Sequence, residues 1–275
     1  MGTLTYMARP LRINFPGALY HITARGNEKK NIYFCDEDRH HFLRMLAKAI
    51  TRFNWVCYDY CLMCNHYHLV IETPLANLSQ GMKYLNGMYS QYINWRYKRV
   101  GHLFQGRFHA ILVEKESHWL EVCRYVVLNP VRAGICDEAE DYIWSSYRAH
   151  RGLVSTPAFL TSSAILPFLG PDLKKSQEAY EVFVKNGKEA RPFDHVRGQI
   201  FLGSEAFIAS FQEDGRKHRG IPKSQTDVLR PSLKTILPAP DGLKSAKTYG
   251  YSSGEVARQL GVHQTTAARR MRQCA

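Results

Sequence analysis

Short apolar segments alternate with amphipathic ones over the first 150 residues of the chain. Strands are predicted at residues 18–24, 55–62, 66–73 and 107–114. Helices are predicted at residues 36–53, 78–97 and 117–129, the last capped by Ser117 and ended by Pro130. The order strand, helix, strand, strand, helix, strand, helix predicts an α+β domain of the ferredoxin-like, split βαβ type. In that arrangement an antiparallel sheet carries helices on one face, and the other face is expected to be free for a ligand.

The pattern changes beyond residue 150. Residues 153–171 carry no charge but contain prolines, glycine and hydroxyl side chains, so they predict a linker and not a membrane span. Helices are predicted at 173–186 and 204–211. The domains are therefore predicted as a catalytic-type domain (1–150), a linker and helical region (151–213), a basic flexible linker (214–250) and a C-terminal DNA-binding segment (251–275).

The C-terminal segment has the layout of a helix-turn-helix. Ser252 and Glu255 match a capping box, and a short helix then runs to Leu260 before a turn at Gly261. A second helix over residues 264–273 carries several arginines and is expected to read DNA. An inert helical tail is the alternative.

The charge distribution favours a polyanionic partner. The formal net charge is +13, and residues 215–275 hold 12 Lys or Arg against 3 Asp or Glu. A surplus concentrated at one end indicates nucleic acid more than a membrane, because no basic amphipathic helix has aromatic anchors. The seven cysteines are odd in number and irregularly spaced, and no signal peptide is visible. A soluble cytoplasmic protein with reduced thiols is expected.

One strand carries candidate metal ligands. Alternation along Cys64–Glu72 places His66 and His68 on the same face, about 7 Å apart along the strand. Two such imidazoles can share one metal ion. By itself a His-x-His pair is weak evidence, because ordinary strand histidines occur in the same pattern.

The last helix of the domain adds a candidate nucleophile. Tyr125 and Asn129 are four residues apart and so lie on one helical face. A tyrosine hydroxyl can be a nucleophile, and an amide oxygen beside it can complete the coordination of a metal. A helical tyrosine that only packs in the core is the alternative.

Five ordered motifs carry a resemblance to a known family. They are Met7-Ala-Arg-Pro-Leu-Arg12, Phe15-Pro-Gly-Ala-Leu-Tyr-His-Ile-Thr-Ala-Arg-Gly-Asn27, Asn65-His-Tyr-His68, Leu103-Phe-Gln-Gly-Arg-Phe108 and Tyr125-Val-Val-Leu-Asn-Pro-Val-Arg132. Together they resemble the single-tyrosine HUH transposases and, within them, the REP-associated tyrosine transposases of bacteria. The resemblance covers roughly residues 7–152. Cys64 departs from it, since the family usually has proline there, but that residue is not a ligand.

The resemblance implies a mechanism. His66 and His68 would bind Mg²⁺ or Mn²⁺, with Asn129 as the third ligand. Tyr125 would cleave single-stranded DNA with a hairpin, such as a REP element, leaving a 5′-phosphotyrosine and a free 3′-hydroxyl, and the strand would then be rejoined. The protein would act as a monomer or homodimer. The second ring nitrogen of each histidine needs a partner, and the candidates are His21 and Glu72.

Several basic and polar residues are candidate DNA contacts. They are Arg12, Arg25, Asn27, Arg107, Arg132, Arg269 and Arg270, the last two for duplex DNA through the C-terminal segment. Surface solubility explains each of them equally well. In the second helix, Met88, Tyr89, Tyr92 and Trp95 are predicted to pack on the sheet.

Three other interpretations remain open. Cys61 and Cys64 with His66 or His68 could hold structural zinc, although buried thiols are favoured. A catalytically silent DNA-binding regulator would keep the basic tail without needing the histidines and tyrosine. A replication initiator or relaxase-like nickase would use the same chemistry, but the chain has no P-loop pattern.

Overall fold

The computed structural model describes residues 13–211 and 230–273. The chain divides into two compact units. Of the described residues, the larger unit comprises 13–196 and 200–203, and the smaller comprises 197–199, 204–211 and 230–273. Each is described by itself. None of the helices in the described ranges combines the length and apolar character needed to cross a membrane.

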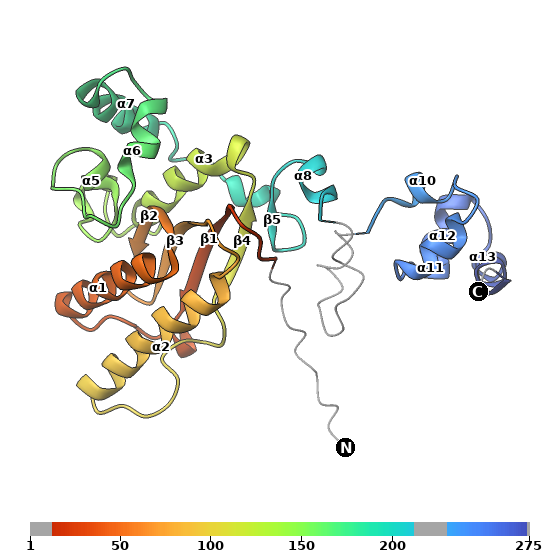
Figure 1. Cartoon of the computed structure of the whole chain (residues 1–275), viewed down its shortest axis with the longest axis horizontal. Helices are drawn as coiled ribbons and strands as arrows, with labels where there is room; N and C mark the ends of the chain where they lie inside the picture. The colour runs from red at the N-terminus through yellow and green to blue at the C-terminus, as the bar shows by residue number, and fades with distance from the viewer. Residues whose placement is uncertain (1–12, 212–229, 274–275) are drawn as a thin grey trace. The chain divides into compact units, whose positions relative to one another are not determined.

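The larger unit is built on a five-stranded sheet (Figure 1). The strands are β1 (Ala18–Arg25), β2 (Val56–Leu62), β3 (His66–Thr73), β4 (His109–Val113) and β5 (Phe201–Leu202). They lie in the order β2-β3-β1-β4-β5. The first four pair antiparallel, while β5 adds a short parallel edge beside β4. The α+β class and the four longer strands are confirmed, whereas β5 was not predicted.

Two long helices cover one face of the sheet. They are α1 (Asp36–Phe53) and α2 (Leu78–Arg96). The Phe42 ring of α1 contacts Tyr67 of β3 and Tyr89 of α2, with ring centroids 4.8 Å and 5.1 Å away. The predicted apolar row of α2 was wrong in part, because Met88 is 39% and Trp95 81% exposed. The buried row follows the i, i+3, i+4 spacing of another face and comprises Leu78, Met82, Leu85, Tyr89 and Ile93.

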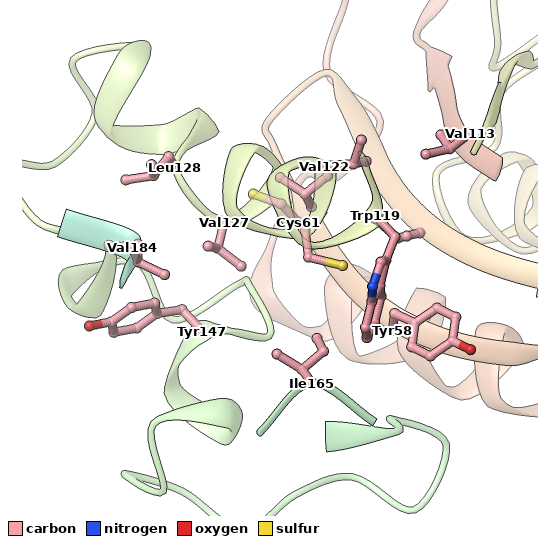
Figure 2. Close-up of a cluster of buried hydrophobic side chains, with 14 of the residues drawn as sticks. Tyr58, Cys61, Val113, Trp119, Val122, Val127, Leu128, Tyr147, Ile165 and Val184 are labelled. Atoms are coloured by element: carbon pink, nitrogen blue, oxygen red, sulfur yellow. The ribbon is translucent and has the colours of Figure 1, made fainter. Parts of the chain in front are cut away.

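The opposite face of the sheet is not open, which corrects the prediction of helices on one face only. Helix α3 (Lys115–Val127) packs across β1, β2 and β3. Its Trp119, Val122 and Val127 belong to a buried cluster that also holds Val113 of β4 and Tyr58 and Cys61 of β2 (Figure 2). The part of this sheet face that α3 covers is therefore closed to a ligand.

The ends of α3 also differ from the prediction. The helix begins at Lys115, and the Ser117 hydroxyl donates to Glu114 (2.7 Å) from within the first turn instead of capping the helix. It ends at Val127, and a short helix α4 (Asn129–Arg132) follows. Pro130 occupies the first turn of α4, where its missing N–H costs no hydrogen bond.

Residues 151–203 are not a linker, because they complete the core of the larger unit. Ile165, Tyr180 and Val184 lie in the same buried cluster as α3 (Figure 2 labels two of them). Helix α7 (Leu173–Lys185) closely matches the helix predicted at 173–186. The shorter elements of this unit are η1 (Asn27–Lys29), η2 (Ala139–Asp141), α5 (Tyr147–His150), α6 (Ser162–Ile165), η3 (Leu166–Phe168), α7 (Leu173–Lys185) and η4 (Pro192–His195).

The smaller unit is helical where it is described. It contains α8 (Glu205–Ala209), α10 (Leu233–Ile236), α11 (Gly242–Thr248), α12 (Ser253–Leu260) and α13 (Gln264–Gln273). The prediction of a flexible linker is wrong for residues 230–250, since Ala246 and neighbouring apolar side chains pack on Val256 and Met271. The capping box of Ser252 and Glu255 is confirmed, and Gly261 ends α12 with φ 63°.

Gly81 of α2 is required by close packing. A Cβ there would lie 2.0 Å from the Trp55 ring, which is buried and held by a hydrogen bond to Asn77 (2.8 Å). Gly81→Ala should therefore destabilise the fold by about 1–3 kcal/mol, offset by up to about 1 kcal/mol of helix propensity. Gly87→Ala in the same helix is the control, because no atom lies within 4 Å of its Cβ position. Denaturant unfolding of both variants checks this: equal stability would contradict the packing.

Candidate functional site

The two histidines of β3 lie on the face that α3 partly covers. His66 and His68 alternate with the buried Tyr67, which points to α1 and α2. The ring centroids of His66 and His68 are 5.0 Å apart. His68 is buried and His66 is half-buried. The alternation of side chains along β3 therefore places both imidazoles on the same face of the sheet, as predicted.

A third histidine completes the buried part of the site. His21 of β1 lies beside His68, with 2.9 Å between Nε2 of His21 and Nδ1 of His68 and the rings stacked at 5.1 Å. The buried Nε2 of His68 has no hydrogen-bond partner in the described structure. If Nδ1 of His68 donates to His21, that Nε2 carries a lone pair with nothing else to bind.

The tautomer of His66 is set by its neighbour in the chain. The Nδ1–H of His66 donates to Oδ1 of Asn65 (2.6 Å), since an amide oxygen only accepts. The other end of the Asn65 amide donates to the Lys29 carbonyl oxygen (2.8 Å), which fixes its orientation. Nε2 of His66 is therefore the nitrogen with a free lone pair. Glu72, the other candidate partner, is engaged elsewhere, because its carboxylate accepts from Tyr58 (2.5 Å) and Lys115 (2.6 Å).

Burial keeps all three imidazoles neutral near pH 7. Desolvation, with the charge of His109, lowers the pKa of His21 to about 3. Desolvation, with the charge of Arg25, lowers the pKa of His66 to about 4. Burial and the two neighbouring histidines hold the pKa of His68 well below its usual value. Neutral imidazole is the form that binds a metal ion.

Tyr125 of α3 lies against these histidines. Its ring centroid is 6.4 Å from those of both His21 and His68. The guanidinium of Arg132 lies 4.4 Å from the tyrosine ring, and Phe193 of η4 lies 4.6 Å from it and 4.6 Å from His21. The structure thus brings the predicted nucleophile and the predicted ligand His68 together.

Arg132 is occupied by the chain itself. It donates to the carbonyl oxygens of Tyr125 (3.3 Å), Gly187 (2.9 Å) and Ala190 (2.6 Å). Burial lowers its pKa. Arg132 therefore links Tyr125 to residues 187–190. A DNA phosphate, as predicted for this residue, would have to bind the same guanidinium beside these carbonyl oxygens.

Asn129 lies one turn after Tyr125, where α4 begins. Its amide nitrogen donates to the carbonyl oxygens of Tyr125 (3.0 Å) and Val126 (3.2 Å). The side-chain oxygen is the atom left to coordinate a metal. Its role as a ligand stays a prediction.

The residues present fit a divalent metal through the histidine pair. Nε2 of His66 carries a free lone pair, and the buried Nε2 of His68 has no hydrogen-bond partner in the described structure. Among residues 13–211 and 230–273, no group of three or more His, Cys, Asp or Glu side chains could hold a metal. Besides the two histidines, a third metal ligand would have to come from an amide such as that of Asn129 or from the DNA itself. For the zinc alternative, Cys61 is packed in the core while Cys64 is exposed.

The other candidate DNA contacts lie at separate places. Arg25 and Asn27 are exposed at the end of β1, where Arg25 is the register partner of His66. Arg107 is exposed at a cavity of about 700 Å³ beside α2. Arg269 and Arg270 are exposed on α13 of the smaller unit, and Arg12 lies outside the described residues.

Two residues of the site were not predicted from the sequence. Asn65 stood inside a quoted motif, and its position directly before His66 was the available signal. Phe193 comes from η4, far beyond Tyr125 in the chain, and no pattern around it pointed to the histidines.

The larger unit is thus an α+β domain with a histidine pair on its sheet and a tyrosine on a helix across from it. Residues 15–129 match the family model described as "Transposase IS200 like". That match confirms, over these residues, the resemblance carried by the sequence motifs. A solved structure described as "Structure of the REP associates tyrosine transposase bound to a REP hairpin" is similar, with 15% sequence identity and a TM-score of 0.47 over 54% of this chain and 88% of that chain. No curated protein matches the chain.

Proposed function

We propose that the protein is a metal-dependent tyrosine transposase that cleaves and rejoins single-stranded DNA at a hairpin. The observation that carries the proposal is the Tyr125 ring lying 6.4 Å from His68, whose buried Nε2 has no partner. The family match of residues 15–129 supports it. So does the sheet order β2-β3-β1-β4, which is the ferredoxin-like order proposed for this domain.

The metal site in this proposal consists of His66 and His68 with Asn129. A bound Mg²⁺ or Mn²⁺ would polarise the scissile phosphate and stabilise charge on its oxygens. Asn65 holds His66 in the tautomer that leaves its Nε2 free, and His21 would do the same for His68 by accepting from Nδ1–H of that ring. Arg25, the register partner of His66, would contact the DNA backbone.

Tyr125 carries out the covalent step. Its hydroxyl oxygen bonds to phosphorus and loses its proton, while the bond from phosphorus to the 3′-oxygen breaks and that oxygen takes up a proton. The products are a 5′-phosphotyrosine and a free 3′-hydroxyl. Attack by another 3′-hydroxyl on the phosphotyrosine reverses the step, so rejoining needs no ATP.

A labelled hairpin with randomised single-stranded tails tests this function. The protein with Mn²⁺ is expected to cut one tail at a defined sequence and to retain part of the strand covalently, and sequencing the products gives the site. Chelation should stop both events. Hairpins recovered intact, with binding only, would favour the silent regulator instead.

The smaller unit is proposed to bind duplex DNA through a helix-turn-helix formed by α12 and α13. Arg269, Arg270 and Arg272 are exposed on α13, as a reading helix requires. Phosphate contacts from such residues give a salt-dependent affinity.

Deleting the chain after Gly203 should therefore separate two activities. The larger unit keeps its own core, so the truncated protein should still nick a short hairpin. Its affinity for flanking duplex should fall, and the salt slope should decrease by about 0.9 for every phosphate that the truncated protein no longer neutralises. Binding measured against salt concentration checks this. Identical slopes would mean that the smaller unit does not touch DNA, and Arg269→Ala with Arg270→Ala should give part of the truncation effect.

A further inference from the structure

A cavity of about 500 Å³ adjoins the candidate nucleophile. One wall comes from Tyr125 and Arg132, and the other from the segment 188–194. This segment lies outside the residues that match the family model. The volume is within the range of about 300–1,000 Å³ typical of small-ligand sites.

The second wall is held in place by the first. Arg132, in the first wall, donates to the carbonyl oxygens of Gly187 and Ala190, at the start of the segment that forms the second wall. Gly187 is buried against Arg124, where a Cβ would lie 2.2 Å from the arginine side chain. Lys188 forms an ion pair with Glu138 (2.8 Å). A wall with these contacts is formed before any ligand arrives, which lowers the ordering cost of binding.

The cavity offers a ring and a cation of the kind that binds a nucleotide. Phe193 is half-buried and borders both the cavity and Tyr125. Arg191 is exposed at the same cavity. Aromatic side chains stack on bases of single strands, and arginine pairs with phosphate. Lys188 is paired with Glu138, and Arg132 is engaged by backbone carbonyl oxygens. Arg191 is therefore the lining cation available to a phosphate, at a cavity that the carboxylates of Glu189 and Asp194 also border.

We propose that this cavity is the subsite for the nucleotide on the 3′ side of the cleaved bond. The inference rests on the proposed function. In that step phosphorus keeps its bond to the 5′-oxygen of this nucleotide, so the nucleotide stays tethered to Tyr125 after cleavage. Phe193 stacks on its base, and Arg191 binds the next phosphate. Residues 187–194 thereby contribute to the choice of cleavage site.

Photocrosslinking tests occupancy without requiring cleavage. The full-length Tyr125→Phe protein is irradiated with a hairpin whose single-stranded tails carry 5-iodouracil, and the crosslinked peptide is identified by mass spectrometry. Crosslinks to Phe193 are expected. Crosslinks confined to other parts of the chain would overturn the subsite.

Affinity measurements identify the base. In the Tyr125→Phe background, an abasic position directly 3′ of the cut should weaken binding by about 5- to 150-fold, the range for loss of one stacked base. Phe193→Leu should weaken binding of intact DNA by a similar factor and remove most of the abasic penalty, because the two changes delete the same stacking interaction. Phe168→Leu is the control, since Phe168 is 69% exposed and does not border the cavity.

Arg191→Gln separates the phosphate contact from stacking. It should weaken binding of intact and of abasic DNA equally and reduce the salt slope by about 0.7, the value for one phosphate of a single strand.

An abasic penalty that persists in Phe193→Leu would overturn the stacking assignment. A faster cleavage rate in Phe193→Leu would also overturn it, because Phe193 would then be a cover over Tyr125. Absence of cleavage by the unaltered protein would contradict the proposed function alone, since crosslinking still reports on the cavity.

Discussion

Tyr125→Phe is expected to abolish cleavage and the covalent adduct while leaving hairpin affinity close to that of the unaltered protein. The substitution removes the hydroxyl that attacks phosphorus and keeps the ring that contacts Arg132, Phe193 and the histidines. Gel analysis of labelled DNA after denaturation measures the adduct, and binding is measured separately.

Tyr142→Phe is the matched control for this experiment. Tyr142 is buried, and its hydroxyl donates to the Leu62 carbonyl oxygen (2.6 Å), so this hydroxyl already has a structural partner. This variant should lose some stability and keep the adduct. Cleavage that survives in Tyr125→Phe would contradict the assignment of the nucleophile.

His68→Ala is expected to eliminate both Mn²⁺ binding and cleavage, and His66→Ala should do the same. Each change removes an imidazole whose Nε2 makes no hydrogen bond in the described structure. His21→Ala should have a smaller effect, about 10- to 100-fold in metal affinity, because His21 orients His68 without binding the ion. Calorimetric titration with Mn²⁺ measures these differences.

His118→Ala is the control for the histidine variants. His118 lies on α3 but contacts Ser117 (2.6 Å) and Glu114 (3.9 Å), not the site. Its metal affinity and cleavage should be unchanged. Purified protein that holds zinc tightly and loses it on substitution of Cys61 or Cys64 would contradict this metal site.

Local periodicity was sufficient for most elements of the sheet domain. Strand β3 and helix α1 have the predicted limits, because alternation and helical spacing follow directly from the direction of each side chain. The pairing of His66 with His68 follows from the same rule. Their contact with Tyr125 could be predicted only through the family resemblance, since it depends on tertiary packing.

The errors arose where packing between distant segments decides the structure. The sheet face was expected to be open because nothing local shows that α3 lies across it. Apart from α7, residues 151–203 form short helices, proline-containing loops and a two-residue strand, so the contribution of these parts to the core leaves no periodic signal. Trp95 was assigned to the core because it shares a helical stripe with Met88 and Tyr92, but that stripe lies off the buried row of α2. Phe193 reaches Tyr125 only through the tertiary fold.

Mass spectrometry of the digested adduct tests the central claim most directly. The protein is incubated with Mn²⁺ and a cleavable hairpin, denatured, and digested with protease and nuclease. The account predicts a 5′-phosphonucleotide on the peptide that contains Tyr125, together with a released strand ending in a 3′-hydroxyl. A nucleotide attached to another residue, a 3′-phosphate linkage, or cleavage with no protein-bound nucleotide would contradict it.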